Sequence, residues 1–517
     1  MEGINMCNLI IENRIDKFQF LDKALLEVRK SNNLSELKEQ FEQFFTNSDT
    51  ANFMAKMIKP TKRKRLKILD PGAGIGILTA ALVINICNWK FKPKLVNAVL
   101  YELDINLNEH LRDVLEYCKH ICKEYNIQFK YQIIQKDFIE QSVESIKKNT
   151  KQNFDCIIMN PPYRKINTGS KEKRMLLSVG IDCSNYYSAF VSLGKRHLKN
   201  KGQIVAITPR SFCNGAYFLE FRKDLLKDMK FQHIHLFHSR KSVFKEDEVL
   251  QENIIYNCVK DKRKKNNRIL ISHSSDNHFV DLQDNRVNLT EIIYPDDEEY
   301  IIHILRDEEE KQICDKMRKL PCTLRDLNID VSTGPVVDFR IENGLLNKEN
   351  VGNGVPIIFS EHISNGFINW PIKDVKKFNY IIPDKTNLSK LRLNGNYVLV
   401  KRMVSKEGKK RVVASIYMSE KFNTKLVGFD NKINYYNINK AGIDIEIARG
   451  LCIYLNSRFV DWYFRIISGS TQINATDLRN IRYPNIIELK ELSRYFIDRL
   501  PEQNEIDSIV ENIVLKG

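Results

Sequence analysis

The sequence contains no long hydrophobic run. No window reaches the roughly 18 consecutive apolar residues that a membrane-spanning helix needs, so we expect no membrane association. Residues 1–17 mix charged and amide side chains with short apolar pairs, which is not the pattern of a secretory signal peptide. Internal repeats and low-complexity segments are also absent. We therefore expect a globular protein of the cytoplasm.

Cysteine patterns typical of disulfide frameworks and zinc sites are missing as well. The eleven cysteines are odd in number and scattered from Cys7 to Cys452. The closest two, Cys118 and Cys122, lie four residues apart in a stretch with helical periodicity, and no second pair at metal-ligand spacing accompanies them. The cysteines are thus expected to be reduced, and no metal site is predicted.

The chain is long, rich in apolar residues and positively charged. Its 517 residues are too many for one compact core, and 43% of them are hydrophobic, so we expect two to four folded domains. Lys and Arg number 81 against 65 Asp and Glu, which leaves a formal charge of +16. Such an excess favours nucleic acid or another anionic partner, the alternative being surface charge without a specific partner.

Apolar periodicity divides the chain. Helical spacing marks residues 1–45, for example at Leu21, Leu25 and Val28. Short apolar runs then alternate with amphipathic stretches, which predicts βαβ units and an α/β fold with a doubly wound, mostly parallel, Rossmann-like sheet. The expected strands are 66–69, 95–101, 131–134, 156–159, 203–207, 234–237 and 254–259. The last two have no clear helix between them, so an antiparallel hairpin at one sheet edge is expected.

From about residue 320 the chain is richer in turn signals such as Ser332–Pro335, and short strands run between them. This pattern predicts a separate C-terminal α+β domain. The expected organisation is an N-terminal helical segment (1–45), an α/β domain (46–270), a connection (271–319), the second domain (320–490) and a helical tail (491–517).

A glycine-rich turn follows the first expected strand. Asp70 ends that strand, and Pro71, Gly72, Gly74 and Gly76 lead into a helical stretch. Glycines allow a ligand to approach the backbone closely, and a helix N-terminus offers free N–H groups. The G-x-G-x-G spacing differs from the dinucleotide fingerprint G-x-G-x-x-G. A nucleotide-like ligand and a purely structural tight turn are both compatible with it.

Acidic residues follow the next two expected strands. Glu102 comes 32 residues after Asp70, where a carboxylate can accept hydrogen bonds from both hydroxyls of a ribose. Asp137 and Phe138 follow the strand at 131–134; the carboxylate can accept from an exocyclic amine and the ring can cover a purine. Solvated loop acids are the alternative for each position alone.

The fourth feature is Asn160–Pro161–Pro162–Tyr163, directly after an apolar strand. Two prolines fix a rigid turn and provide no competing N–H groups. The Asn160 side chain and the Pro161 carbonyl can then converge on one amine, and Tyr163 offers a flat ring for stacking. A plain Pro-Pro turn is the alternative for an isolated match, but here the motif follows the glycine turn and two acidic strand ends in order.

This ordered set resembles the S-adenosylmethionine-dependent DNA adenine-N6 methyltransferases of type II restriction–modification systems, of the gamma-type motif order. The resemblance covers about 46–260 and extends into the C-terminal half through Ser332–Gly334, Lys401–Arg402 and the string at 469–479 (GSTQINATDLR), which is similar to the PstI-related methyltransferases. It implies the cofactor S-adenosyl-L-methionine, double-stranded DNA as partner, and a cognate restriction endonuclease that acts independently.

The resemblance also implies roles for individual residues. Thr46 falls where the family has a Thr-Pro pair that touches the methionine moiety, although Asn47 replaces the proline here. The implied cofactor-binding residues are Thr46, Asp70, Pro71, Gly72, Gly74, Glu102, Leu103, Asp137, Phe138 and Phe190. The implied catalytic residues are Asn160, Pro161, Pro162 and Tyr163. Tyr163 and Phe244 would clamp a flipped adenine, with a core position as the alternative for Phe244.

Basic and amide residues of the C-terminal half are the candidates for holding and reading DNA. They are Lys401, Arg402, Lys410, Arg411, Gln472, Asn474 and Arg479. A solvated surface is the alternative for each.

Three other functions stay open at this point. An RNA or protein methyltransferase can use the same Asn-Pro-Pro-Tyr motif, but the long C-terminal half with its DNA-enzyme-like string disfavours it. An N4-cytosine DNA methyltransferase is chemically close, although such enzymes more often have Ser at the position of Asn160. A non-catalytic DNA-binding specificity subunit would not need the intact set Gly72, Glu102, Asp137 and Asn160.

Overall fold

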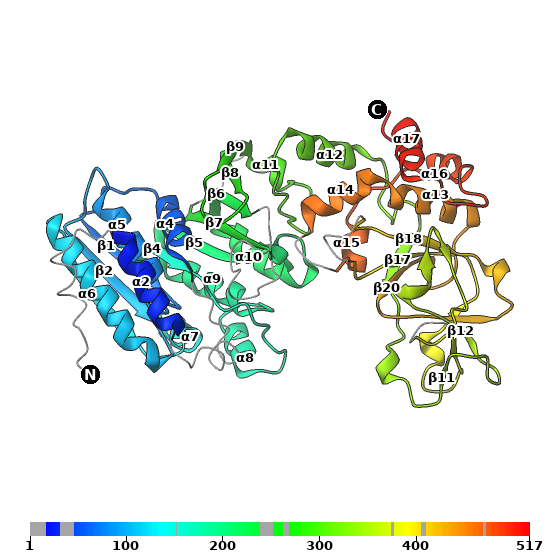
Figure 1. Ribbon diagram of the computed structural model, residues 1–517, viewed down its shortest axis with the longest axis horizontal. Coiled ribbons are helices and arrows are strands. Elements are labelled where there is room, and N and C mark those ends of the chain that lie inside the picture. The colour runs from blue at the N-terminus through cyan, green and yellow to red at the C-terminus, as the bar shows by residue number, and fades with distance from the viewer. Residues whose placement is uncertain are drawn as a thin grey trace. The chain divides into compact units, whose positions relative to one another are not determined.

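The computed structural model describes residues 17–30, 46–150, 152–237, 252–261, 268–373, 377–404, 410–468 and 472–516. The chain divides into two compact units, Met1–Arg306 (unit 1) and Asp307–Gly517 (unit 2). Figure 1 shows the elements of both units. Each unit has its own sheets and core.

Unit 1 is built on one nine-stranded sheet in the order β3-β2-β1-β4-β5-β7-β6-β8-β9. Its strands are β1 (Arg65–Asp70), β2 (Leu95–Tyr101), β3 (Gln128–Ile134), β4 (Phe154–Met159), β5 (Leu198–Pro209), β6 (Met229–Phe237), β7 (Asn253–Lys260), β8 (Arg268–Ser274) and β9 (Gln283–Asn288). All six residues of β4 are buried, because helices cover both faces of the sheet at its centre.

The helices of unit 1 form two groups. One contains α2 (Lys17–Lys30), α4 (Ser48–Met57), α5 (Ile77–Cys87) and α6 (Asn108–Glu124), which pack against one another. The other contains α7 (Phe138–Lys147), α8 (Lys171–Leu177), α9 (Tyr186–His197) and α10 (Leu219–Asp228), and α11 (Leu289–Ile292) follows β9. The chain runs outward from β1 to β3 and then returns to β4 and β5, so right-handed crossovers place the two groups on opposite faces. This confirms the predicted doubly wound α/β fold.

The reversal of strand order between β1 and β4 determines where a ligand can bind. β1 pairs in parallel with β2 on one side and with β4 on the other. The connections that leave these strands at their carboxyl ends diverge to opposite faces, and this leaves a crevice. The Gly-rich turn after β1 and Asn160 after β4 both lie at this crevice.

The predicted antiparallel pairing of the last two strands is confirmed, but their predicted place at the sheet edge is wrong. β7 inserts between β5 and β6 and is antiparallel to both. β8 and β9 then extend the sheet beyond β6, past the predicted domain boundary at residue 270. Because the insertion depends on contacts between distant strands, the apolar runs alone do not determine it.

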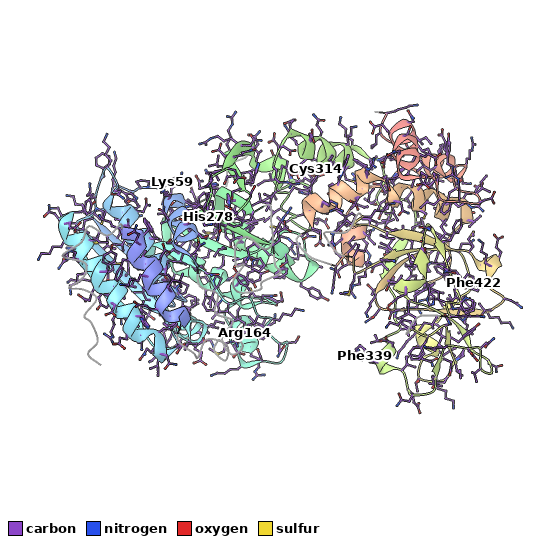
Figure 2. All side chains as sticks on the ribbon, viewed as in Figure 1. Lys59, Arg164, His278, Cys314, Phe339 and Phe422 are labelled. Atoms are coloured by element: carbon purple, nitrogen blue, oxygen red, sulfur yellow. The ribbon has the colours of Figure 1, made fainter. Side chains whose placement is uncertain are left out.

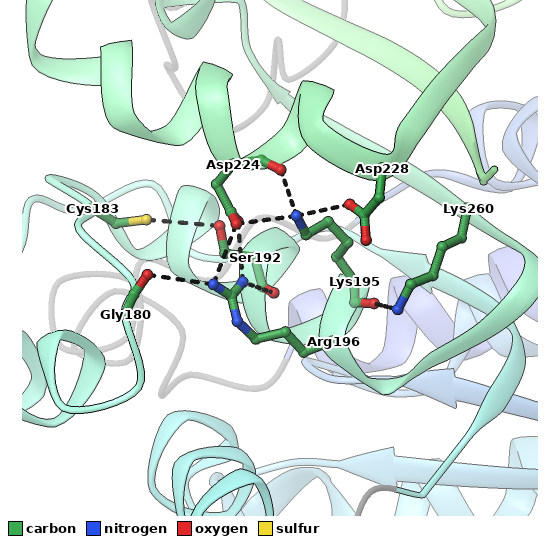
Figure 3. Close-up of polar contacts among 8 residues, drawn as sticks. All are labelled: Gly180, Cys183, Ser192, Lys195, Arg196, Asp224, Asp228 and Lys260. Atoms are coloured by element: carbon green, nitrogen blue, oxygen red, sulfur yellow. Dashed lines mark hydrogen bonds and ion pairs between the residues drawn. The ribbon is translucent and has the colours of Figure 1, made fainter. Parts of the chain in front are cut away.

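A cluster of charged side chains fixes α9 to its neighbours (Figure 3). Lys195, which is 4% exposed, contacts Asp224 at 3.0 Å and Asp228 at 2.9 Å, both in α10. Arg196 contacts both oxygens of Asp224, at 3.1 and 3.2 Å, and Lys260 of β7 donates to the Lys195 carbonyl at 2.8 Å. Although burial opposes it, these two cations hold the pKa of Asp224 below its ordinary value. The cluster therefore anchors the helix that carries Phe190.

Unit 2 combines two small sheets with helices. The first sheet has the order β10-β20-β17-β18-β14-β13 and the second the order β11-β15-β12-β19-β16. The strands of the first are β10 (Asp330–Thr333), β20 (Ile433–Asn437), β17 (Tyr397–Lys401), β18 (Ala414–Tyr417), β14 (Phe367–Ile368) and β13 (Ile363–Ser364). Those of the second are β11 (Leu346–Asn347), β15 (Tyr380–Ile381), β12 (Val355–Ile358), β19 (Leu426–Phe429) and β16 (Arg392–Leu393).

The helices of unit 2 are α12 (Glu308–Lys319), α13 (Ile445–Asn456), α14 (Arg458–Ile467), α15 (Ala475–Arg479), α16 (Ile486–Ser493) and α17 (Gln503–Ile513). Buried aromatic side chains, including Tyr397, Tyr417, Phe429 and Tyr435, fill the core between the strands. Helices α16 and α17 pack on α13. The predicted tail is thus part of the α+β unit, since its apolar face is covered there.

Candidate functional site

The glycine turn after β1 has the geometry of a ligand-binding turn. Gly74 and Gly76 have φ angles of 54° and 87°, a left-handed region that favours glycine. A Cβ at Gly76 would lie 2.8 Å from Leu111 Cδ1, so α5 begins in close contact with α6. The turn brings the Gly72 and Gly74 backbone to the N-terminus of α5, and both glycines line an open cavity.

Asp70 supports this turn from inside the protein. The side chain is 1% exposed, and its Oδ2 accepts a hydrogen bond from the Thr79 hydroxyl at 2.9 Å. Burial raises the pKa of Asp70 to about 7, against the opposing effects of Thr79 and the Gly72 backbone. Asp70 does not line the cavity. The prediction that Asp70 contacts a ligand directly is therefore not met, because its side chain points into the protein.

Glu102 joins the end of β2 to the glycine turn. Its Oε2 accepts from the Gly74 N–H at 2.7 Å and its Oε1 from the Asp104 N–H at 2.9 Å. The residue is 8% exposed and lines the cavity, and burial raises its pKa although the two N–H donors oppose the shift. Neighbouring Leu103 also lines the cavity and is 48% exposed. The carboxylate is thus held in place before any ligand contacts it.

Two aromatic rings form the next wall of the cavity. Asp137 caps α7 by accepting from the Glu140 N–H at 2.9 Å, which directs Phe138 into the protein, and burial raises the pKa of Asp137. The ring centroid of Phe138 lies 5.0 Å from that of Phe190 of α9. Gly72 adjoins this wall, since a Cβ added to it would lie 3.8 Å from the Phe190 ring, an ordinary contact distance. Phe138 and Phe190 thus form an aromatic side of the cavity, with the Asp137 carboxylate beside it.

The Asn160 carboxamide is held from both sides. Its Nδ2 donates to the Thr46 hydroxyl at 3.1 Å, and its Oδ1 accepts from the Tyr163 hydroxyl at 3.2 Å. Thr46 and Tyr163 are 6% and 4% exposed. The Tyr163 ring lies edge-on to Tyr187, with centroids 6.3 Å apart. These contacts fix the plane of the amide and the direction of its oxygen.

These elements surround one cavity with about 910 Å³ of empty space, part of it open to solvent. Of the predicted residues it is lined by Thr46, Pro71, Gly72, Gly74, Glu102, Leu103, Asp137, Phe138, Asn160, Pro161, Pro162 and Phe190. Tyr163 lies behind Asn160 and does not line it, and Phe244 lies outside the described residues. Sequence reasoning missed Ala73, Ile75, Ile77, Leu78, Tyr101 and Lys136, whose only signal is that they adjoin the motif residues.

The candidate DNA-contacting residues of unit 2 partly converge. β10 pairs with β20, and β20 pairs with β17, so Thr333 and Lys401 lie at the same end of one sheet. The Arg402 side chain contacts Asn474 Oδ1 at 3.0 Å and Gln472 Oε1 at 3.4 Å. Three segments that are far apart in sequence therefore meet at one surface.

The other candidates differ in exposure. Arg411 is 1% exposed, and its guanidinium donates to the Val404 carbonyl at 3.0 Å and to the Ser468 hydroxyl at 3.3 Å. The prediction that Arg411 contacts DNA is therefore wrong, because burial makes it a core residue. Burial lowers the pKa of half-buried Lys410. Arg479 contacts Asp330 at 2.7 Å and keeps 42% of its side chain exposed.

Neither a metal site nor a membrane-spanning helix is found among the described residues. No group of three or more His, Cys, Asp or Glu side chains there could hold a metal ion. None of the helices in that part of the chain is both long and apolar enough to cross a membrane.

The chain is similar over most of its length to known proteins. The family described as "Eco57I restriction-modification methylase" matches residues 77–244. The type II methyltransferase M.PstI of Providencia stuartii is 41% identical over 475 residues, 92% of this chain and 93% of that protein. M.BsuBI of Bacillus subtilis is 41% identical over 504 residues, 96% and 97% of the two chains. Among solved structures, the DrdV–DNA complex aligns with a TM-score of 0.50 and 13% identity, covering 94% of this chain and 60% of that one.

Proposed function

Because the chain belongs to the type II methyltransferases of restriction–modification systems, we propose that it transfers a methyl group from S-adenosyl-L-methionine to the N6 amine of adenine in double-stranded DNA. The observation that carries the proposal is the fixed Asn160 carboxamide, which stands at the wall of a cavity lined by two carboxylates and two phenylalanine rings. Protection of the host's DNA against a separately acting endonuclease is the proposed biological role.

The residues around the cavity fit each part of this cofactor. Phe138 and Phe190 would cover the adenine ring, while Asp137 would accept from its amine. Glu102 would accept from the ribose hydroxyls, as a buried carboxylate at this strand end can. The Gly72 and Gly74 backbone would approach the amino-acid end of the cofactor.

Once bound, the cofactor supplies an electrophilic methyl group on a sulfonium. The N6 of adenine is a poor nucleophile, because its lone pair is delocalised into the ring. The Asn160 oxygen and the Pro161 carbonyl would accept its two hydrogens, which draws the nitrogen toward a tetrahedral shape and frees the lone pair. Acceptors held in advance need no reorganisation during the reaction. In-line transfer then follows from proximity and orientation.

Thr46 and Tyr163 hold the Asn160 carboxamide in the orientation that this step requires. With Nδ2 bound to Thr46, the amide oxygen is presented as the acceptor. For stacking on a flipped base, the Tyr163 ring would have to enter the cavity from its buried position behind Asn160. We therefore assign Tyr163 a positioning role through its hydroxyl in addition to the stacking role that the family resemblance implies.

In unit 2 we propose that the surface around Arg402 contacts DNA. The side-chain oxygens of Asn474 and Gln472 accept hydrogen bonds from Arg402 and so orient its guanidinium group. The paired N–H donors of a guanidinium suit a guanine edge or a phosphate. Lys401, Lys410 and Arg479 would neutralise neighbouring phosphates. Binding to phosphates should weaken steeply with salt, because each contact releases counterions.

The test is transfer of a labelled methyl group to plasmid DNA, followed by digestion to nucleosides and identification of the modified base. We expect N6-methyladenine, and N4-methylcytosine would overturn the adenine assignment. The Asn160→Ala variant should lose turnover by a factor of about 100 or more, the range for removing one transition-state donor or acceptor, while it still binds the cofactor. Asn88→Ala, at an exposed position at the C-cap of α5, is the matched control and should keep wild-type turnover.

A further inference from the structure

A strongly basic surface lies on unit 1 away from the cavity. It consists of Lys62, Lys64, Arg65, Lys90, Lys92 and Lys94, all exposed, which we call the basic edge. The residues belong to two segments, one leading into β1 and the other joining α5 to β2. The backbone holds the two segments together, because the N–H groups of Lys94 and Leu95 donate to the Lys64 carbonyl at 2.8 and 3.2 Å.

The basic edge surrounds an exposed aromatic ring. Phe91 is 54% exposed, and the Nζ atoms of Lys62 and Lys90 lie 5.4 and 6.0 Å from its ring centroid. Lys92 approaches the ring of Tyr125 at 5.8 Å. Cations interleaved with exposed rings are the composition of surfaces that bind nucleic-acid backbones and bases.

The charge of the basic edge is not compensated within the described residues. There, none of its six cations has a carboxylate within ion-pair distance. Asp155 is a buried acid on β4, the strand that pairs with β1. It is already paired with Arg63 at 2.9 Å and with Lys199 at 2.9 Å. Cations that repel one another in this way create a positive potential, and a polyanion would relieve it.

The basic edge faces away from the proposed chemistry. Its segments precede β1 and β2, so they lie at the amino ends of parallel strands whose carboxyl ends form the cavity. A six-residue strand such as β1 separates the two ends by about 20 Å. In Figure 2, Lys59, next to the basic edge in sequence, and Arg164, two residues after Pro162, lie toward opposite sides of the unit. The basic edge would therefore hold a different DNA segment from the one whose base enters the cavity.

We propose that the basic edge binds the phosphate backbone of a second DNA segment, independently of its sequence. The proposal goes beyond the proposed function and rests on it only in taking DNA as the polyanion that this chain encounters. The second segment is either remote DNA of the same molecule or another duplex. Such a contact would keep the protein on DNA while the cavity face is empty or between methylation events.

The test compares two triple variants with the same loss of charge. Lys90, Lys92 and Lys94 are changed to Ser in one, and Lys223, Lys227 and Lys230 are changed to Ser in the other. The second set lies on α10 and the start of β6, four strands away from β1 in the sheet order. Binding of a labelled duplex of random sequence is measured by fluorescence anisotropy across a salt series, with the full-length protein.

We expect the basic-edge variant to bind this duplex at least about tenfold more weakly and to lose up to about three units from the slope of log affinity against log salt. The α10 variant should match the wild type. Both variants should keep the wild-type maximal rate on saturating plasmid DNA. A ternary complex with two duplexes of different label should form with wild type and be lost in the basic-edge variant.

Equal affinity and equal slope in the two triple variants would overturn the proposal. So would a basic-edge defect seen only with phosphatidylserine vesicles or only with polyglutamate, since the partner would then be a membrane or an acidic protein. The binding measurements do not depend on methyl transfer. If the wild type proves inactive on DNA while the basic-edge defect is present, the proposed function fails and this inference stands.

Discussion

The Thr46 hydroxyl accepts a hydrogen bond from the Asn160 amide nitrogen, and this contact leads to a specific prediction for Thr46→Val. Valine has nearly the shape of threonine but cannot accept the hydrogen bond. The Asn160 carboxamide would then be held only by its remaining partners, and its oxygen would spend less time in the productive direction. Because Thr46 is 6% exposed, water does not readily replace the lost group.

The size of the effect follows from the strength of one buried neutral hydrogen bond. Such a bond contributes about 0.5–1.5 kcal/mol. If the whole loss appears as a less ordered acceptor in the transition state, the rate falls by about 2- to 13-fold. We expect this decrease in kcat, measured by single-turnover methyl transfer with saturating cofactor and DNA. The affinity for the cofactor, measured by calorimetry, should change less than kcat does.

Three variants separate this positioning role from a general packing role. Thr46→Ser keeps the hydroxyl and should restore most of the rate. Tyr163→Phe removes the opposite hydrogen bond, to the amide oxygen, and should cause a decrease of similar size while it keeps the ring. In an Asn160→Ala background, Thr46→Val should have no further effect on the residual rate, because the group that it positions is gone.

The reasoning is refuted if Thr46→Val keeps the wild-type kcat while Asn160→Ala abolishes activity. It is also refuted if Thr46→Val changes only the affinity for the cofactor, or if its effect on the residual rate is undiminished in the Asn160→Ala background. Any of these three outcomes would mean that Thr46 does not act by positioning Asn160.

Three other predictions concern the scaffold. Because burial raises the folded-state pKa of Asp70 to about 7 from its ordinary 3.8, the folded state favours the protonated acid. The contribution of Asp70 to stability is therefore fully present below its ordinary pKa and is lost as the pH rises to 7. Asp70→Asn should accordingly gain in melting temperature relative to wild type as the pH rises from ~4 to ~7; a constant difference would contradict this. Gly76→Ala should destabilise unit 1 by about 1–3 kcal/mol in denaturant unfolding, because φ is 87° and the added Cβ meets Leu111, whereas Gly169→Ala, with open space around it, should have little effect. Arg411→Met should destabilise the protein by about 2–4 kcal/mol by leaving buried acceptors without their donor, and half-exposed Arg479→Met should cost less than about 1 kcal/mol; equal effects on stability would argue against the core role of Arg411.

The fold of unit 1 was predictable because its central strands contain short apolar runs and helical stretches lie between the first of them. β2 begins and ends where its apolar run does, and β4 differs by only two residues. The placement of β7 between β5 and β6 was not predictable, because a hairpin at the edge and an inserted strand have the same local pattern. Only pairing with the distant β5 decides between them.

The cavity was predictable for a topological reason. Parallel strands bring their carboxyl ends to one edge, so residues that directly follow β1, β2, β3 and β4 had to meet. What this rule does not provide is the direction of each side chain. Asp70 turns inward to Thr79, and Tyr163 turns behind Asn160. Each direction is set by a hydrogen bond to a nearby residue and by packing, as of Tyr163 against Tyr187, which a position at a strand end does not reveal.

Charge was the least predictable property, because sequence shows how many cations there are but not whether they reach solvent. Arg411 belongs to a basic run and is nevertheless buried, whereas Lys94 adjoins buried Pro93 and is exposed. The positive surplus of the chain was assigned from sequence to the C-terminal half, where only the surface around Arg402 gathers several candidates. Among the described residues, the largest group of the cations discussed that has no carboxylate partner, the basic edge, is on unit 1. Since phosphate binding depends on exposed, unpaired cations, the DNA affinity of this protein should be shared between its two units, and removal of charge from either one alone should leave substantial salt-dependent binding.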